Sequence, residues 1–173
     1  MLLTSRMNSS EPWVALAQDN QIVVSKFVSA TKMWAQQGSV LNFNPANAAS
    51  TPSLDFGGTN HDTAWVAWTE KISGTNQVLA ARLDGSQWTF TGSHSNGAPI
   101  VNQPSDKLIY DPVLATGAVI TGAEPLPWLA WGEGNGFQGQ LEIRRAVSDV
   151  AALGGLRWEQ VITPTSPSIA YKP

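Results

Sequence analysis

The stretch Ala64-Trp65-Val66-Ala67-Trp68 decides the fold, because close copies of it occur at two other places in the chain. The copies are Pro12-Trp13-Val14-Ala15-Leu16 and Pro127-Trp128-Leu129-Ala130-Trp131. Each run is short, rich in apolar and aromatic residues, and bounded by turn-forming residues, as expected of a β-strand. The first tryptophans of the runs are 52 and then 63 residues apart, which is typical of a repeat architecture.

Three further elements follow each of these runs in a constant order. The first opens with glutamine and carries a basic residue at a fixed place, the second is marked by a tryptophan, and the third is led by a proline. They are Gln21–Lys26, Gln77–Arg82 and Gln140–Arg145; Trp34, Trp88 and Trp158; and Pro52–Leu54, Pro112–Leu114 and Pro167–Ile169. We therefore predict one all-β domain over 1–173 with approximate repeats 1–51, 52–111 and 112–166, and with 167–173 as the first strand of a further unit.

The turn residues and the distribution of apolar residues favour radially stacked sheets. Asp84-Gly85 is typical of a hairpin turn, Gly154-Gly155 takes the same place in the last repeat, and the prolines suit the start of a strand. Runs such as Trp65–Trp68 and Ile22–Val24 are apolar at successive positions, which indicates that both faces of the strand are covered. Four-stranded blades packed around an axis meet this condition, with tryptophans filling the widening space between them.

These repeats resemble those of bacterial β-propellers of the Trp-rich, kelch-like or Asp-box-like kind, over about Leu2 to Tyr171. The resemblance implies about three four-stranded antiparallel blades plus one extra strand; an immunoglobulin-like sandwich is the alternative. Propellers have roughly four to eight blades, so three cannot close a ring. We expect a partial propeller: either a piece of a longer one, or one completed by oligomerisation. In both cases Met1–Ser5 is a shortened inner strand, and Pro167–Tyr171 joins a blade outside this chain.

Composition excludes several classes of function. Charged residues make up 13% of the chain, the formal net charge is −3 and cysteine is absent. This balance predicts no nucleic-acid surface and no polybasic membrane anchor, and no apolar run reaches the ~18–20 residues of a transmembrane helix. The lack of cysteine excludes disulfides, thiolate metal sites and a cysteine nucleophile. Few lysines and arginines, together with many amide and hydroxyl side chains, favour an extracellular or periplasmic location.

The residue types that bind ions predict neither a metal site nor a cofactor. The two histidines, His61 and His94, fall in loops expected at opposite ends of the sheets. Asp55, Asn60 and Asp62 offer oxygen atoms, but their spacing matches no calcium loop, and such residues are common in turns.

A sialidase-like activity is not supported by the motifs. The nearest approach to the Asp-box pattern Ser-x-Asp-x-Gly-x-Thr-Trp is Leu83–Trp88, in which Asp and Gly are adjacent and the upstream Ser is missing. Arg82 and Arg145 recur at equivalent positions, as do Glu70 and Glu133, whereas catalytic residues rarely recur in each unit. We therefore predict that the chain is not an enzyme and that these pairs are structural.

The long polar loops at one end of the predicted sheets are the candidate binding surface, since loops on a rigid scaffold commonly carry function. They are Asn42–Thr51, Thr91–Asp111, Thr163–Ser166, Lys71–Asn76 and Gly132–Gly139. From them we take four candidate ligand-binding residues, Asn96, Asn102, Asn135 and Gln138. The predicted function is a non-catalytic binding or scaffold module for protein interaction or assembly, with a protein partner or a second copy completing the propeller. The alternatives are a lectin-like propeller that stacks a glycan on tryptophan, a truncated domain of a sialidase-like enzyme, and loops that are merely solvated.

Overall fold

The chain folds into three antiparallel sheets, each formed by one continuous stretch of sequence. The computed structural model describes residues 2–5, 11–58, 60–95, 98–102, 107–117, 125–134 and 139–162; the description of 2–5, 93–95, 98 and 162 is confined to the backbone. The first sheet has the order β1 (Leu2–Ser5), β2 (Pro12–Gln18), β3 (Gln21–Val28), β4 (Met33–Gln36). The middle sheet has the order β5 (Ala49–Gly57), β6 (Thr63–Ile72), β7 (Thr75–Asp84), β10 (Ala98–Ile100), β9 (Ser93–Ser95), and β8 (Gln87–Thr91) also pairs with β7. The last sheet has the order β11 (Leu108–Thr116), β12 (Pro127–Gly134), β13 (Gly139–Ser148), β14 (Leu156–Ile162).

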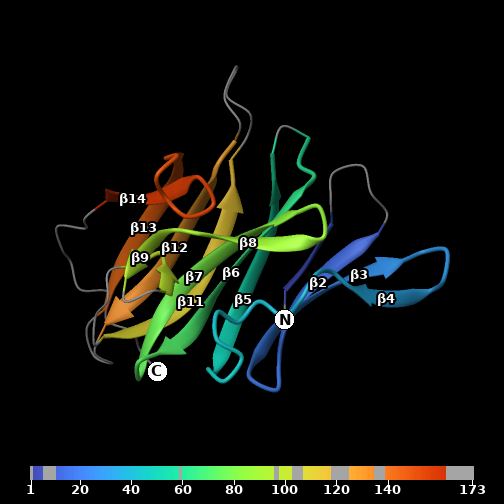
Figure 1. The fold of residues 1–173 in the computed structure, drawn as a ribbon, viewed down its shortest axis with the longest axis horizontal. Helices are drawn as coiled ribbons and strands as arrows, with labels where there is room; N and C mark the ends of the chain where they lie inside the picture. Colours follow the sequence, from blue (N-terminus) through green and yellow to red (C-terminus); the bar gives the residue numbers. More distant parts are fainter. Residues whose placement is uncertain are drawn as a thin grey trace.

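The sheets lie side by side in chain order, from the blue first sheet at the right of Figure 1 to the orange last sheet at the left. Two hydrophobic cores fill the spaces between neighbouring sheets. The first core joins Trp13, Ile22 and Val24 to Leu54, Val66 and Trp68; the second joins Trp65, Ala67 and Val78 to Leu114, Leu129 and Trp131. The middle sheet is therefore covered on both faces.

Strand β6 shows this double coverage most clearly. All residues from Ala64 to Glu70 are buried, and their side chains alternate between the two cores because side chains alternate across a strand. In β12, buried residues alternate with more exposed ones, since within the described residues only one face of the last sheet lies against another sheet. The predicted continuous burial thus holds for the middle sheet and for Trp13, Val14 and Ala15 of β2. It does not hold for Ile22–Val24, where Val23 is half-buried, or for β12.

Pro52 and Pro112 do not begin their strands, contrary to the prediction, and Pro167 lies outside the described residues. Strands β5 and β11 start before Pro52 and Pro112, and each proline lies within a register shift of its strand pair. A bulge leaves an amide outside the ladder, so a residue without an N–H is tolerated there. Proline has no N–H to donate to a strand ladder, so it needs a position where no ladder hydrogen bond is made. A bulge meets this requirement as well as a strand end does.

The segment Thr91–Asp111, expected to be one long loop, holds a β-hairpin. Strands β9 and β10 pair with each other, and Ile100 of β10 pairs with Leu79 of β7. The main chain of His94 accordingly lies in β9 and not in a loop. Strands of three residues are too short to show an alternating pattern in the sequence.

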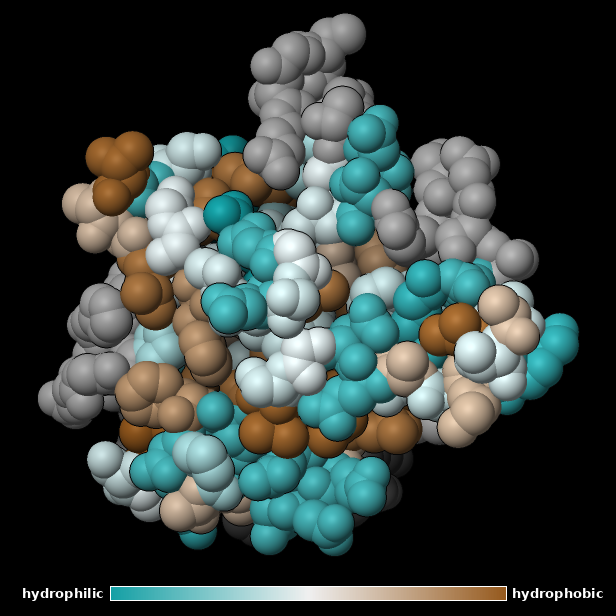
Figure 2. Space-filling model, turned by 45° about the vertical axis from the view of Figure 1, so that its right-hand side comes forward, coloured by the Kyte–Doolittle hydropathy of each residue, from teal (hydrophilic) through white to brown (hydrophobic). Residues whose placement is uncertain are grey.

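The all-β prediction is confirmed, and the described residues show no closed propeller. Among them there is no helix, and hence none long and apolar enough to cross a membrane. The predicted strand 167–173 lies outside the described residues. Figure 2 views the molecule with the side of the first sheet turned forward. The surface seen there is largely hydrophilic, and its hydrophobic residues gather mainly in a low band and at the left edge.

Candidate functional site

The loop between β4 and β5 is fixed by the carboxylate of Glu70, which is 1% exposed. Its oxygens accept hydrogen bonds from the backbone N–H groups of Phe43 (2.9 Å) and Asn44 (3.0 Å). They also accept from the side-chain amide of Asn47 (2.9 Å) and the indole N–H of Trp68 (3.2 Å). Hydrogen bonds to a charged acceptor are the strong ones, so this carboxylate holds one of the predicted binding loops in place.

Two asparagines at equivalent positions each accept a hydrogen bond from a backbone N–H, one in β3 and the other in β7. Oδ1 of Asn42 accepts a hydrogen bond from the N–H of Ile22 at 2.9 Å, and Oδ1 of Asn102 accepts one from the N–H of Val78 at 2.8 Å. Asn102 is 3% exposed, and its Nδ2 donates to Oε1 of Gln77 at 3.0 Å. The amide of this predicted ligand-binding residue is therefore engaged within the fold.

The other three candidates, Asn96, Asn135 and Gln138, lie outside the described residues, so ligand binding there stays a prediction. The structural use of the asparagine pair was missed from the sequence. A signal was present: an apolar residue, an asparagine and a nearby proline recur in Leu41–Pro45 and Val101–Pro104.

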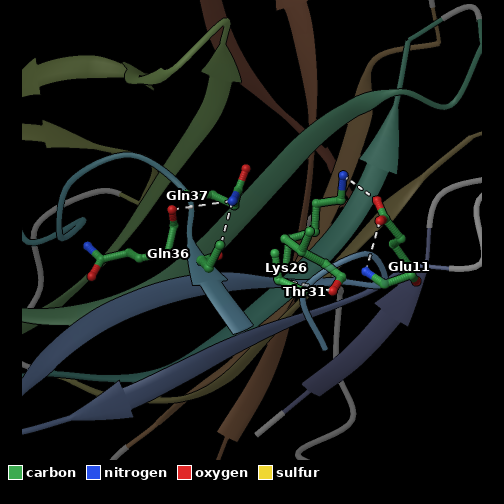
Figure 3. Close-up of polar contacts among 8 residues, drawn as sticks. Glu11, Lys26, Thr31, Gln36 and Gln37 are labelled. Atoms are coloured by element: carbon green, nitrogen blue, oxygen red, sulfur yellow. Dashed lines mark hydrogen bonds and ion pairs between the residues drawn. The ribbon is translucent and has the colours of Figure 1, made fainter. Parts of the chain in front are cut away.

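The recurrent basic residue forms an ion pair in each sheet. The pairs are Lys26 with Glu11 (Figure 3), Arg82 with Asp84 at 3.1 Å, and Arg145 with Glu159 at 3.3 Å. Glu11 also accepts the N–H of Ser29 at 3.2 Å, and the hydrogen bonds from Lys26 and Ser29 lower the pKa of this carboxyl. Such exposed pairs contribute little stability, and their recurrence fits a role within each sheet.

No group of three His, Cys, Asp or Glu side chains in the described part of the chain is placed to hold a metal ion. Oδ1 of Asp55 accepts the N–H of Phe56 at 2.8 Å, and Oδ2 accepts the N–H and the hydroxyl of Thr116 at 2.8 and 2.9 Å. Nδ1 of His61 lies 3.2 Å from the carbonyl oxygen of Phe56. Asp55 thus links the inner strands of the middle and last sheets.

We call the face of a sheet that points toward the next sheet along the chain its forward face, and the opposite face its rear face. The rear face of the last sheet carries a buried polar cluster: Glu133 is 7% exposed, Glu142 5% and Arg144 8%. The two oxygens of Glu142 accept hydrogen bonds from the amides of Gln140 and Gln160, each at 3.0 Å. Charged side chains are rarely buried to this degree unless they are paired.

Two N–H donors in or beside this polar cluster have no hydrogen-bond acceptor among the described residues: Nε of Arg144 within it, and Nε1 of Trp131, which pairs with Glu142 across β12 and β13. The guanidinium carbon of Arg144 lies 5.7 Å from the centroid of the Trp131 ring, a cation–π distance. Burial lowers the pKa of Arg144, while the charges of Glu142 and Glu133 act against this shift. Burial raises the pKa of Glu142, and the charge of Arg144 opposes the rise. Free donors beside carboxylate acceptors are the groups that bind hydroxyl-rich ligands.

The polar cluster departs from the repeat. Trp131 pairs with Glu142 where the middle sheet pairs Trp68 with Leu79, and Leu79 is fully buried. Arg144 likewise takes the place of a buried alanine. Charges at core positions cost free energy, so a repeat that abandons its apolar pattern at one place marks a candidate site. This departure is visible in the sequence, because Glu142 and Arg144 of Gln140–Arg145 stand where Gln77–Arg82 has Leu79 and Ala81. No role was assigned to these two charged residues from the sequence.

The forward face of the last sheet is not covered by the described residues. Trp128 is 40% exposed, whereas Trp13 and Trp65, at the equivalent positions of the preceding sheets, are 5% and 1% exposed. Val113 and Leu141 on the same face are 60% and 40% exposed. The same position in the repeat is a core residue twice and a surface residue once.

Strand β13 inverts the usual relation between hydropathy and burial. Its charged residues Glu142 and Arg144 are buried on the rear face, whereas Leu141 is exposed and Ile143 only half-buried on the forward face. A sheet with one face in water normally places its apolar residues inward and its polar residues outward. The forward face of the last sheet is therefore apolar, although the described residues leave it exposed.

Two surfaces of the last sheet thus stand out, the polar cluster and the forward face. The forward face consists of Val113, Ala115, Trp128, Ala130, Leu141 and Ile143, which the strand register aligns across β11, β12 and β13. No family model matches the chain, and neither a curated protein nor a solved structure matches it.

Proposed function

We propose that the chain forms three blades of a β-propeller and works as a non-catalytic binding or scaffold module. The order of strands in each sheet, the side-by-side arrangement and the tryptophan-filled cores support this architecture. The module contacts its partner through the forward face of the last sheet, so that the partner takes the place of a further blade.

The observation that carries the proposal is the exposure of Trp128. Burying apolar surface contributes about 25 cal/mol per Å², and aromatic residues dominate the energetics of protein interfaces. Trp13 and Trp65 gain this contribution inside the chain, whereas Trp128 at 40% exposure gains it only from a partner. A contiguous apolar patch of this kind is typical of a protein contact surface.

Site-specific photo-crosslinking tests the proposal. We would place benzoylphenylalanine at Leu141 on the forward face and, as a matched control, at Val150, which is fully exposed in a turn away from this face. The full chain is irradiated in the cells that produce it, and crosslinked products are separated and identified by mass. A product of discrete mass from position 141 and none from position 150 is expected. Absence of any product from position 141 would contradict a binding role for this face.

The polar cluster favours a second candidate function, lectin-like carbohydrate binding. The unsatisfied donors of Trp131 and Arg144 and the acceptors of Glu142 are buried, and the exposed residues Gln140 and Gln160, whose amides bind Glu142, are the groups that sugar hydroxyls can reach. Binding of a panel of neutral and acidic glycans would be measured by calorimetry. Loss of binding in Arg144→Met but not in Arg157→Met, a substitution of an exposed arginine in the same sheet, is the result expected of a lectin. A glycan that binds both variants equally would exclude the polar cluster as the site.

An extracellular or periplasmic location accords with either function, since glycans and assembly partners are both met outside the cytoplasm. A truncated domain of a sialidase-like enzyme remains the third proposal. Measurement of sialidase and other glycosidase activity on the chain, with and without Glu142→Gln, would decide it.

A further inference from the structure

We propose that the forward face of the last sheet binds the rear face of the first sheet of a second copy of this chain, head to tail. This inference rests on the function proposed above and names the partner. Three separate observations carry it: a contact used twice within the chain, a second uncovered tryptophan that complements the first, and a change of residue type at the exposed face.

The chain itself already contains the proposed contact twice. The ring of Trp13 on the first sheet packs edge to face on Phe56 of the middle sheet, with centroids 5.3 Å apart. Trp65 occupies the same position of the next sheet and belongs to the core shared with Leu114 of the last sheet. In both cases the forward face of one sheet packs against the inner strand of the following sheet. Trp128 holds the same position on the last sheet and is available for a third contact of this kind.

The first sheet offers the matching rear face. Trp88 of the middle sheet donates its indole N–H backward to the carbonyl oxygen of Gln37 at 2.8 Å, and Trp158 of the last sheet donates backward to Oγ1 of Thr91 at 3.3 Å. Trp34 holds this position in the first sheet and is 49% exposed, whereas Trp158 is 7% exposed. Within the described residues, Trp34 therefore has no preceding sheet of the kind that covers its equivalents.

The acceptor position for Trp34 is uncovered at the other end of the chain. Gln37 and Thr91 each lie three residues after the tryptophan of their own sheet. The same count in the last sheet reaches Val161, which is 39% exposed and lies at the register shift beside Ile162, the residue that pairs with Ile143 as Thr91 pairs with Ala80. In the proposed contact Trp34 lies against Val161 of the second copy, while Trp128 of that copy lies against β1. By strand register Leu3 of β1 holds the position of Leu54 and Leu114, which are buried inner-strand residues.

The forward face of the last sheet has also lost the polar residues of the middle sheet. Oγ of Ser53 accepts the N–H of Leu114 at 2.9 Å, and Asp55 accepts two hydrogen bonds from Thr116. The strand register places Val113 and Ala115 at the positions of Ser53 and Asp55. In the middle sheet both polar side chains bind the last sheet, so their replacement by Val113 and Ala115 makes the exposed forward face of the last sheet more apolar than its equivalent, as expected of a dry contact.

Sedimentation velocity on the full chain over a ~100-fold range of concentration tests the contact. The forward-face variant is W128S; the rear-face variant is W34S; the control is V150S, an apolar-to-polar change at a fully exposed position. All three residues are substantially exposed, so circular dichroism should report unchanged folding. We expect the wild type and V150S to associate alike, and each face variant to associate at least ~10-fold more weakly. A mixture of the two face variants should regain association, because one complementary pair of faces stays intact.

Three results would overturn the head-to-tail contact. They are a wild type that stays monomeric throughout, a W34S variant that associates as tightly as the wild type, and a mixture that associates no better than its components. The crosslinking experiment separates these from a failure of the proposed function. A product between position 141 and a different protein refutes the second copy as partner but keeps the binding role, whereas no product at all refutes both.

Discussion

The rings of Trp13 and Phe56 meet edge to face across the boundary between the first two sheets, with their planes at 84°. This geometry is the favoured one for aromatic pairs, because the positive edge of one ring faces the negative face of the other. The contact repeats in position, though not in residue type, where Trp65 lies near the inner strand of the last sheet. One tryptophan position therefore decides how each sheet meets the next.

The three equivalent tryptophans should differ in their contribution to stability. We expect Trp65→Ala to lower the free energy of unfolding by about 3–5 kcal/mol, since it empties a buried site. Trp128→Ala should lower it by less than about 1 kcal/mol at concentrations where the chain is monomeric, because the side chain is 40% exposed. Urea denaturation monitored by circular dichroism measures both values. Equal losses would show that Trp128 is buried within the isolated chain.

The Glu70 carboxylate should be needed to hold the loop that it binds. Glu70→Ala leaves the N–H groups of Phe43 and Asn44 without an acceptor, and we expect a loss of about 2–4 kcal/mol in the free energy of unfolding. Gln18 holds the equivalent position in the first sheet and is exposed, so Gln18→Ala should change stability by no more than about 0.5 kcal/mol. A similar effect of the two substitutions would contradict the anchoring role.

The asparagine pair can be tested one amide at a time by native-state hydrogen exchange. In Asn42→Ala the amide of Ile22 loses its acceptor and should exchange faster, while the amide of Val78 keeps Asn102 and should exchange at its former rate. Asn102→Ala should produce the opposite result. Acceleration of both amides in either variant would indicate global destabilisation instead of a local bond.

The buried charges of the polar cluster should be costly to break and cheap to replace together. Glu142→Leu alone leaves Arg144 buried with Glu133 as the remaining opposite charge, and we expect a loss of about 3–5 kcal/mol. The double variant E142L/R144A restores the residue types of the middle sheet, and its stability should equal or exceed that of the wild type by up to about 4 kcal/mol. Denaturant unfolding of the wild type, both single variants and the double variant gives the coupling energy. Additive losses would show that the two side chains act independently.

Glu142 should make stability fall as pH rises. Its pKa is raised by burial, so the folded state binds its proton more tightly than the unfolded state does. The resulting contribution is fully present below the ordinary pKa of glutamate and is lost as pH rises through the elevated folded pKa. Glu142→Gln should remove this part of the pH dependence. Glu11, whose pKa is lowered by Lys26 and Ser29, acts in the opposite sense, and its contribution is lost as pH falls through the lowered value.

The repeat made the strands and their order predictable, because runs such as Trp65–Trp68 combine apolar character with recurrence. The bulges were not predictable from proline, since Pro52 fits a strand start and a bulge equally well. The β9–β10 hairpin escaped because two strands of three residues carry no periodic signal. Local sequence patterns identify a strand. They do not say whether the backbone accommodates a proline by starting the strand there or by forming a bulge.

The candidate surfaces were only partly within reach of the sequence. The alternation Leu141-Glu142-Ile143-Arg144 predicts that one face of β13 is apolar, but alternation alone does not say which face meets the middle sheet. The register with β12 decides it, and places the charges inward. Asn102 was selected as a polar loop residue. Its hydrogen bond to the backbone of Val78 was signalled only by the recurrence of an asparagine near a proline in Leu41–Pro45 and Val101–Pro104.

The succession of forward and rear faces gives the stack a polarity, like that of a polymer with distinguishable ends. Each added copy covers one forward face with its rear face and exposes a new forward face of its own. One contact repeated without change therefore either closes into a ring or extends into a filament. The turn between successive sheets decides between these outcomes, and it depends on the bulk of the side chains packed between the sheets, with Trp65 among the largest of them. A smaller side chain there would flatten the turn and increase the number of units that a closed circle needs.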